Sequence, residues 1–230
     1  MKLSIIIPCF NEKKTIEKIL IKISREKKIS KQIILVDDGS NDGTKKLIKK
    51  KLYRYVDKVI YHKSNNGKGS CIKSAQKYIK GDAVIIQDAD LEYFPSDYHK
   101  LLKKLNSKKK YRAIYGSRVL GSPRYLSNNF SSIYRIFFNH ALSLITNVVC
   151  NQNLTDAHTC YKLIDATLFK KIVLREKDFA FCPEITAKIS KLGIKILEVP
   201  IKYKGRNYNE GKKIKFYDGI RALFTIFKYS

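Results

Sequence analysis

Residues 83–95 read AVIIQDADLEYFP, and this stretch decides how the rest of the chain is interpreted. Its first four residues are apolar and predict a short buried strand, which leads into the paired carboxylates of Asp88 and Asp90. Side chains two residues apart in an extended chain point the same way, so both aspartates can hold one metal ion if the strand continues through them. Proteins usually hold Mg²⁺ with one or two carboxylates together with phosphate oxygens. The stretch therefore favours a cation site for a phosphorylated ligand, against the alternative of two solvated aspartates at a turn.

Two earlier apolar runs have the same arrangement. Residues 3–7 (LSIII) and 33–36 (IILV) both predict buried strands, and helical patterns at 12–25 and about 42–51 follow them. Alternating strands and helices are typical of a mostly parallel sheet with helices on both faces. The loops that follow parallel strands meet at one edge of the sheet, where ligands bind. We therefore expect an α/β, Rossmann-like fold that brings PCFNE, DDGSNDGT and DADLEY to one edge.

Length and composition indicate one domain. The chain has 230 residues, of which 44% are hydrophobic, and no linker rich in Pro, Gly or Ser divides it. The apolar run at its N-terminus is too short for a signal peptide, so we expect a cytoplasmic protein. Its five cysteines are widely spaced and lack a C-x-x-C pair, which argues against a disulfide framework or a zinc site and predicts free thiols.

The charge of the chain allows three interpretations. Lys and Arg number 47 against 20 Asp and Glu, a net charge of +27 that could serve nucleic-acid binding through phosphate neutralisation. Many of the lysines, however, fall on the expected outer faces of helices. They fit either an ordinary solvated surface or attraction to anionic lipid. Because the sequence has no recognised nucleic-acid motif or zinc-finger spacing, we expect no nucleic acid partner and keep a basic nucleic-acid-binding module as an outside alternative.

Six motifs carry a resemblance to a known family. They are IIIPCFNE (5–12), VDDGSNDGT (36–44), NNGKG (65–69), QDADLEYFP (87–95), GSR (116–118) and TDAHTCYKLI (155–164). In this order they resemble the motifs of family 2 glycosyltransferases over nearly the whole chain. The resemblance is strongest to the subgroup that includes dolichyl-phosphate mannose synthase and bacterial polyprenyl-phosphate glycosyltransferases.

This resemblance implies a metal-dependent, inverting glycosyltransferase with a single GT-A type domain. It implies a nucleotide-diphospho-sugar donor, linked to GDP or UDP, and Mg²⁺ or Mn²⁺ at the D-x-D triplet. The implied acceptor is a polyprenyl phosphate, either dolichyl or undecaprenyl. The protein would then be peripheral on the inner face of a membrane.

The resemblance also assigns roles to single residues. It implies that Asp88 and Asp90 bind the metal and that Glu92 completes the shell of the ion. Arg118 is placed near the phosphates and Asp156 near the acceptor, and both join the aspartate pair as candidate catalytic residues. Contacts with the nucleotide sugar are implied for Pro8, Phe10, Glu12, Val36, Asp38, Lys68, Asp88, Ala89, Asp90, Arg118, Arg206 and Lys212.

Simpler roles compete at some of these positions. Glu12 could complement the charge at a helix N-terminus, and Lys68 could belong to a plain turn before a helix. Glu92 could be an exposed loop acid and Arg118 a surface arginine. Phe10 replaces the tyrosine that is more common in the family, so it keeps a stacking face and loses a hydroxyl.

The second half of the chain contains two amphipathic segments, 131–149 and 214–229. The first is too short and too polar to span a bilayer, so it is either a core helix or a helix in the membrane interface. We expect residues 1–118 to form the nucleotide-sugar-binding half of the domain and residues 119–230 the acceptor-binding half.

Two alternatives to this function remain. A transferase that acts on a hydroxyl of a polysaccharide, a lipid or another acceptor would use the same donor site. A dinucleotide-binding oxidoreductase is disfavoured because no G-x-G-x-x-G follows the first strand.

Overall fold

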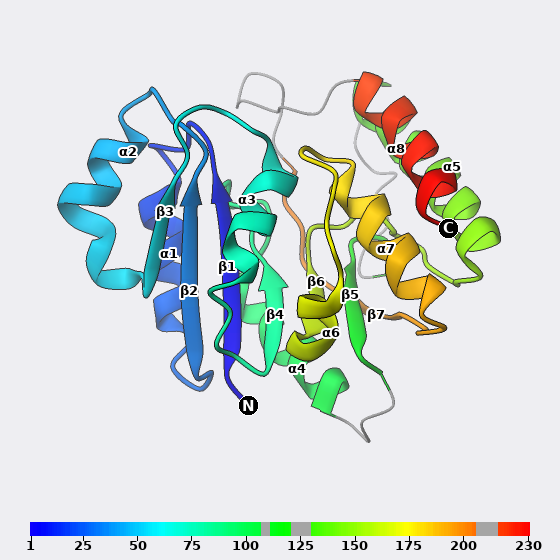
Figure 1. Cartoon of the computed structure of the whole chain (residues 1–230), viewed down its shortest axis with the longest axis horizontal. Coiled ribbons are helices and arrows are strands. Elements are labelled where there is room, and N and C mark those ends of the chain that lie inside the picture. Colours follow the sequence, from blue (N-terminus) through cyan, green and yellow to red (C-terminus); the bar gives the residue numbers. More distant parts are fainter. Residues whose placement is uncertain (107–110, 121–129, 206–215) are drawn as a thin grey trace.

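The computed structural model describes residues 1–106, 111–120, 130–205 and 216–230, with side chains omitted at 130–135 and 216. Within these ranges one seven-stranded sheet has the order β3-β2-β1-β4-β6-β5-β7 (Figure 1). Its strands are β1 (Leu3–Cys9), β2 (Lys31–Asp37), β3 (Lys58–Tyr61), β4 (Ala83–Ile86), β5 (Ala113–Ser117), β6 (Lys162–Asp165) and β7 (Leu197–Pro200). The sheet is mostly parallel as predicted, because only β6 runs against both of its neighbours among these strands.

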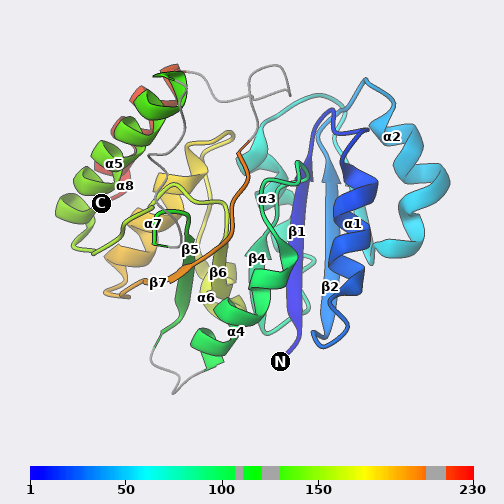
Figure 2. The same cartoon turned by 180° about the vertical axis from the view of Figure 1, so that it is seen from behind.

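Helices cover both faces of the sheet, as the sequence predicts. Figure 1 shows α3 (Lys68–Gln76), α6 (Ala166–Lys171) and α7 (Phe181–Lys191) in front of the sheet. Figure 2 shows α1 (Ile16–Arg25) and α4 (Tyr98–Asn106) on the opposite face. This double cover explains the continuous apolar runs of the central strands, since both sides of each strand are buried.

The core forms where the predicted periodicities place it. The leucine, isoleucine and cysteine side chains of β1 are buried, and the apolar stripe of α1 packs against the same core. That stripe consists of Ile16, Ile19, Leu20 and Ile23. The helix begins at Ile16, later than expected, because Glu12 belongs to the preceding turn and its carboxylate accepts a hydrogen bond from Thr15 Oγ1 at 2.6 Å.

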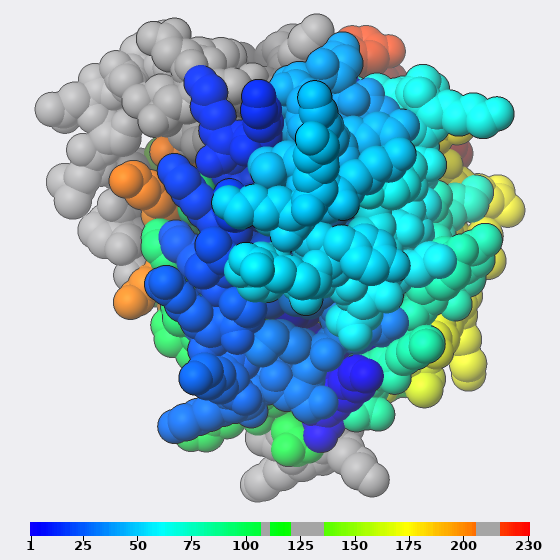
Figure 3. Space-filling model, turned by 90° about the vertical axis from the view of Figure 1, so that its left-hand side faces the viewer, coloured from blue at the N-terminus to red at the C-terminus, as the bar shows by residue number. Residues whose placement is uncertain are grey.

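The helix expected at about 42–51 is irregular. Its α-helical part, α2, covers only Thr44–Leu47 and continues into a π-helical turn, Ile48–Leu52, and a 3₁₀ turn, Tyr53–Tyr55. Ile48 and Leu52 are buried, whereas most of the lysines between them and before them are exposed. Figure 3 shows the face formed by this region and α1, from which many long side chains project.

A second, smaller core joins α7 to α5 (Phe130–Cys150) and α8 (Phe216–Tyr229). Its buried members are Leu142, Cys150, Ala187, Ala222, Ile226 and Tyr229. One side of each amphipathic helix is therefore a core face, and other apolar side chains of the same helices remain exposed. Within the described ranges, no helix combines the length and the apolar character needed to cross a bilayer.

All five cysteines are free and buried, which confirms the prediction of free thiols.

Candidate active site

The ends of β1, β2 and β4 lie side by side, so the loops after them leave from one edge of the sheet. β1 pairs in parallel with β2 through Cys9 and Asp37, and with β4 through Ile6 and Ile86. The first two loops contact each other directly, because the N–H of Asn11 donates to Ser40 Oγ at 2.9 Å. The predicted meeting of these loops at one edge is confirmed.

The paired carboxylates do not continue the strand, contrary to the geometry assumed from the sequence. β4 ends at Ile86, and the chain then turns, with Leu91 at a φ of 68°. Asp90 Oδ1 accepts a hydrogen bond from the N–H of Glu92 at 3.1 Å. Because the chain turns here, Asp88 and Asp90 do not follow the alternation of side chains along an extended strand.

A buried polar network supports this turn from below. The hydroxyls of Tyr98 and Tyr161 each donate to Gln87 Oε1 at 2.6 Å, and Gln87 Nε2 donates to the carbonyl of Asp88 at 2.9 Å. All three supporting side chains are completely buried. The network therefore fixes the backbone at the first aspartate of the pair.

Lys68 supplies a positive charge to this turn. Its ammonium forms an ion pair with Asp88 Oδ1 and a contact of 3.4 Å with Cys160 Sγ. Burial works to lower the pKa of Lys68, but the negative charge of Asp88 outweighs it and raises the pKa well above its ordinary value. Lys68 is the first residue of α3 and also forms an ion pair with Asp88. The simpler alternative, a plain turn before a helix, does not account for this ion pair.

The donor atoms at this edge fit a divalent cation. Carboxylate oxygens are the ligands that Mg²⁺ and Mn²⁺ prefer, and the ammonium of Lys68 shows that Asp88 attracts positive charge here. Glu92 is tied to a neighbouring segment, since Tyr203 Oη donates to its Oε2 at 2.8 Å. The assignment of Glu92 to the metal shell stays a prediction.

Asp37 and Asp38 at the end of β2 have different surroundings. Among the described residues, none donates a hydrogen bond of good geometry to either carboxylate oxygen of Asp37, although Ser40 lies close enough to affect its charge. Burial raises the pKa of Asp37, an effect that Ser40 and the charge of Lys45 offset only in part. Asp38 accepts hydrogen bonds from His62 Nδ1 at 2.6 Å and from two backbone N–H groups.

Those two N–H groups belong to Asn66 and Gly67, so Asp38 anchors the NNGKG loop. Gly67 has a φ of +89°, and a Cβ there would collide with the backbone of Lys177. The loop therefore needs glycine at this position. The carboxylate of Asp38 thus accepts hydrogen bonds from His62 and from the NNGKG loop. Contact between Asp38 and a nucleotide stays a prediction.

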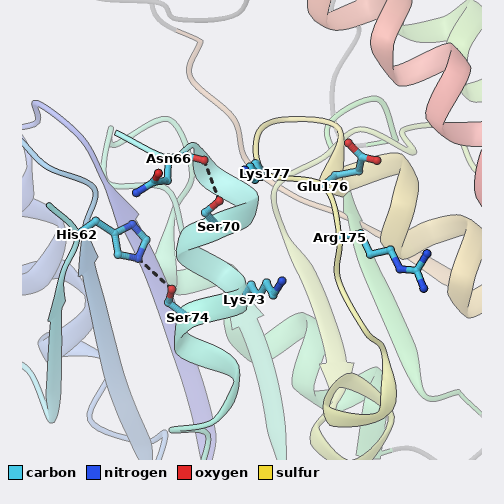
Figure 4. Close-up of a pocket in the computed structure, with 8 residues that line it drawn as sticks. All are labelled: His62, Asn66, Ser70, Lys73, Ser74, Arg175, Glu176 and Lys177. Carbon is cyan, nitrogen blue, oxygen red and sulfur yellow. Dashed lines mark hydrogen bonds between the residues drawn. The ribbon is translucent and has the colours of Figure 1, made fainter. Parts of the chain in front are cut away.

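A pocket of about 240 Å³ borders this loop, between α3 and the segment before α7 (Figure 4). In the close-up, His62 points toward α3, where its Nε2 lies 2.9 Å from Ser74 Oγ. The pocket lining includes neither the aspartate pair nor Arg118. The pocket therefore lies outside the aspartate pair, and it shares His62 and Asn66 with the surroundings of Asp38.

Arg118 and Asp156 form a buried ion pair. Arg118 Nε and Nη2 donate to the two carboxylate oxygens of Asp156 at 2.6 and 2.7 Å, and the backbone N–H of Arg118 adds a third bond at 3.0 Å. The side chains are 11% and 2% exposed, which excludes the alternative of a surface arginine. The guanidinium also lies 5.1 Å from the ring centroid of Tyr203.

The remaining predicted residues take various positions. Pro8 lies on β1 and Phe10 in the loop after it, both half-buried, and Glu12 is buried next to the start of α1. The side chains of Val36 and Ala89 are buried, so a nucleotide would meet their backbone. Arg206 and Lys212 lie outside the described residues.

The sequence analysis missed four residues of this site: His62, Gln87, Cys160 and Tyr203. His62 is a single histidine after an edge strand, and nothing local marks it as the partner of Asp38. Gln87 was visible in the quoted motif, and its position between the apolar run 83–86 and Asp88 was the one available signal. The other two act through contacts that are remote in sequence.

Comparison with known proteins gives a family. The sequence model of "Glycosyl transferase family 2" matches residues 4–173. An uncharacterized protein of Methanocaldococcus jannaschii, MJ1222, is 28% identical over 224 residues, which cover 96% of this chain and 89% of that protein. Dolichyl-phosphate beta-glucosyltransferase ALG5A of Trichomonas vaginalis is also 28% identical, over 98% of this chain and 72% of its own length.

The solved structures agree on the fold. Glucosyl-3-phosphoglycerate synthase of Mycobacterium tuberculosis, in complex with Mn²⁺, UDP and phosphoglyceric acid, superposes with a TM-score of 0.72. The superposition covers 99% of this chain and 78% of that one at 15% sequence identity, so it confirms the GT-A type fold and no more. The match over residues 4–173 shows that this chain belongs to glycosyltransferase family 2.

Proposed function

We propose that the protein transfers a sugar from a UDP- or GDP-linked donor to a polyprenyl phosphate at a membrane surface. The observation that carries this proposal is the ion pair between Arg118 and Asp156. Asp156 is the carboxylate for which the family resemblance implies a place near the acceptor, and it is buried against a guanidinium. A carboxylate held in this way is a poor base, whereas a phosphate acceptor needs none, because it is already ionised at neutral pH.

The donor would bind at the edge formed by the ends of β1, β2 and β4. Asp88 and Asp90 would hold Mg²⁺ or Mn²⁺, which when bound offsets the negative charge of the donor diphosphate. Lys68 lies beside them and stays protonated, so it adds a second positive charge close to the leaving group. The Mn²⁺ and UDP held by the structural neighbour support this assignment.

The reaction itself would be a direct displacement. An oxygen of the acceptor phosphate forms a bond to the anomeric carbon while the bond from that carbon to the donor diphosphate breaks. The nucleoside diphosphate leaves with the bonding electron pair, and the configuration at the anomeric carbon inverts. Arg118 would hold phosphate oxygens during this step through Nη1 and the second hydrogen of Nη2, because its Nε and the first hydrogen of Nη2 already donate to Asp156.

The acceptor assignment rests further on the relatives and on the surface. Two relatives are dolichyl-phosphate beta-glucosyltransferases, the second of which is 24% identical to this chain. On the surface, α5 and α8 lie next to each other at the end of the molecule opposite α2 (Figures 1 and 2). Their exposed apolar side chains are Phe137, Leu144, Val148, Tyr217, Ile220, Phe224 and Phe227.

These side chains follow helical spacing, so each helix presents an apolar stripe to its surroundings. We call the two stripes together the α5–α8 apolar face. Such a face, on a chain of net charge +27, suits peripheral contact with an anionic membrane. In this proposal residues 1–118 bind the donor and residues 119–230 bind the acceptor and the membrane.

The test is a product assay with vesicles. Purified protein is incubated with Mn²⁺, UDP- or GDP-sugars and vesicles that contain an anionic lipid and polyprenyl phosphate, and products are identified by mass. We expect a polyprenyl-phospho-sugar whose formation stops when EDTA removes the metal. Turnover with 3-phosphoglycerate or a saccharide, and none with polyprenyl phosphate, would refute the acceptor and leave the family assignment intact.

A further inference from the structure

Lys162 is a buried lysine to which the reaction described above gives no role. It opens β6 and its side chain is completely buried, in a strand whose next two residues are the apolar Leu163 and Ile164. Its ammonium donates to the carbonyl of Ala157 at 2.7 Å and lies 3.8 Å from the ring centroid of Tyr115. Lysine is almost never fully buried without a reason, because the charged form loses its hydration.

The carbonyl that Lys162 holds belongs to the loop of the ion pair. Ala157 follows Asp156 directly, and its own N–H donates to Ser143 Oγ at 3.1 Å. Glu198 accepts hydrogen bonds from the N–H of Asp156 at 2.9 Å and from the N–H of Thr155 at 2.7 Å. The loop is thus held at three N–H groups by acceptors and at one carbonyl by a cation.

Charged and titratable groups face Lys162 from three elements. The loop before β6 contributes Asp156, His158 and Cys160. Tyr115 lies on β5, Arg118 directly follows that strand, and Cys182 lies on α7. Burial lowers the pKa of Lys162 to about 8; Cys182 and Asp156 oppose this effect and Arg118 adds to it. Burying the charged ammonium therefore lowers the stability of the folded protein. An apolar side chain of similar size would fill the same space without this penalty.

We propose that Lys162 is a positioning residue for sugar transfer. Its ammonium fixes the Ala157 carbonyl and thereby the carboxylate of Asp156, which in turn orients the guanidinium of Arg118 toward the phosphates. Loss of the positive charge would leave Asp156 attached to a looser loop and Arg118 misdirected. This inference rests on the proposed function, because it gives Arg118 its phosphate partner.

The experiment compares wild type with Lys162→Met, which keeps the length of the side chain and removes its charge. Sugar transfer from the active donor is measured between pH 6 and 9.5. We expect wild-type kcat to fall above a pH of about 8, with the ionisation of Lys162. In Lys162→Met we expect kcat lower by about ten- to a hundredfold at pH 7, as for other residues that orient a functional group, and no fall near pH 8.

A matched control is Tyr115→Phe, which keeps the ring beneath the ammonium and removes only a hydroxyl bonded to Thr186 Oγ1 at 3.0 Å. It should keep the wild-type pH profile. The melting temperature at pH 7 is the second readout. In Lys162→Met it should stay high enough for the protein to be folded at the assay temperature, so that loss of folding does not explain the fall in kcat. Wild-type kcat and an unchanged alkaline fall in Lys162→Met would overturn the inference.

The proposed function can fail independently of this inference. If wild type turns over no polyprenyl phosphate and another acceptor is active, the same pH comparison is made with that acceptor. If no donor is turned over, binding of UDP and GDP with Mn²⁺ is measured at pH 7 and 9.5. Equal affinities of wild type and Lys162→Met at both pH values would then contradict the role of Lys162.

Discussion

Arg118 holds Asp156 through two parallel hydrogen bonds, 2.6 and 2.7 Å long, although the two residues lie 38 positions apart. A bidentate pair of this kind fixes the plane of the guanidinium. It also binds the carboxylate that otherwise is the obvious candidate for a general base. In the proposed reaction, this pair would join the carboxylate near the acceptor to the guanidinium that holds the phosphates.

Removal of the guanidinium should disable the enzyme. Arg118→Ala takes away the proposed phosphate contact and leaves Asp156 as an uncompensated buried charge. We expect kcat/KM for transfer to fall by about 100- to 1,000-fold, the usual effect of losing one donor to a developing anion. Stability should fall by about 3–5 kcal/mol, measured by urea unfolding, because one partner of a buried pair is lost.

A second Arg–Asp pair offers the control for this change. Arg112 and Asp165 are 2.7 Å apart but 42% and 32% exposed, and they lie away from the reactive edge. Arg112→Ala should keep activity near wild type and cost about 1 kcal/mol or less. Equal loss of activity in both variants would show that Arg118 has no special role.

The aspartate pair should control binding of the metal and the donor. Asp88→Asn and Asp90→Asn are each expected to abolish Mn²⁺-dependent binding of the best nucleoside diphosphate, measured by calorimetry, while circular dichroism stays unchanged. Asp82→Asn, before β4 and at the opposite end of that strand, is the matched control and should bind normally. Wild-type affinity in both Asp88→Asn and Asp90→Asn would remove them from the metal site.

The α5–α8 apolar face should carry the protein to membranes. Phe224 is 71% exposed on α8, and Tyr53 is an aromatic residue of similar exposure, 69%, in the 3₁₀ turn after α2. In flotation with anionic vesicles, Phe224→Glu should weaken binding by about tenfold, since it removes apolar area and adds a repelled charge. Tyr53→Glu should float nearly as well as wild type. An equal loss of vesicle binding in the two variants would show that the net charge of the protein, and not the α5–α8 apolar face, determines the binding.

Stability should depend on pH through Lys162. Burial lowers the pKa of this lysine from 10.5 to about 8 in the folded protein. Below pH 8 the group is charged in both states and its burial cost is fully present; the cost is relieved as pH rises from 8 toward 10.5. Lys162→Met removes this cost, which is about 3 kcal/mol at about 1.4 kcal/mol per pKa unit, but it also leaves the Ala157 carbonyl without its donor, which costs about 1–3 kcal/mol. The difference in stability between Lys162→Met and wild type should therefore change with pH.

Urea unfolding at pH 7, 9 and 10.5 measures this difference. The stability of Lys162→Met relative to wild type should fall by about 3 kcal/mol as pH rises from 7 to 10.5, because only wild type gains stability when its buried lysine loses the proton. A difference that is constant with pH would mean that Lys162 does not titrate in this range.

Much of this fold could be predicted from the sequence, because its central strands are continuous apolar runs followed by turn residues. The order of β6 could not. This strand pairs between β4 and β5, antiparallel to both, and its position depends on contacts across the chain that no local pattern records. The irregular course after Thr44 was also missed, since the lysine-rich segment is compatible with an ordinary helix.

The candidate site was also predicted only in part. Motif order and strand ends predicted which residues meet at the edge, but the pairing of charges there is tertiary. Lys68 with Asp88, and Arg118 with Asp156, are joined by folding over 20 and 38 positions. The bend after β4 likewise replaced the extended geometry on which the metal argument first depended.

The central claim is that the acceptor is a phosphate that needs no protein base. The most direct test offers polyprenyl phosphate and a polyprenol of the same length to wild type and Asp156→Asn, with Mn²⁺ and the active donor, and measures initial rates. We predict that wild type uses the phosphate and ignores the alcohol, and that Asp156→Asn keeps measurable transfer to the phosphate. Transfer to the alcohol, or to another hydroxyl acceptor, that disappears in Asp156→Asn while donor binding persists would contradict the account and make Asp156 the general base.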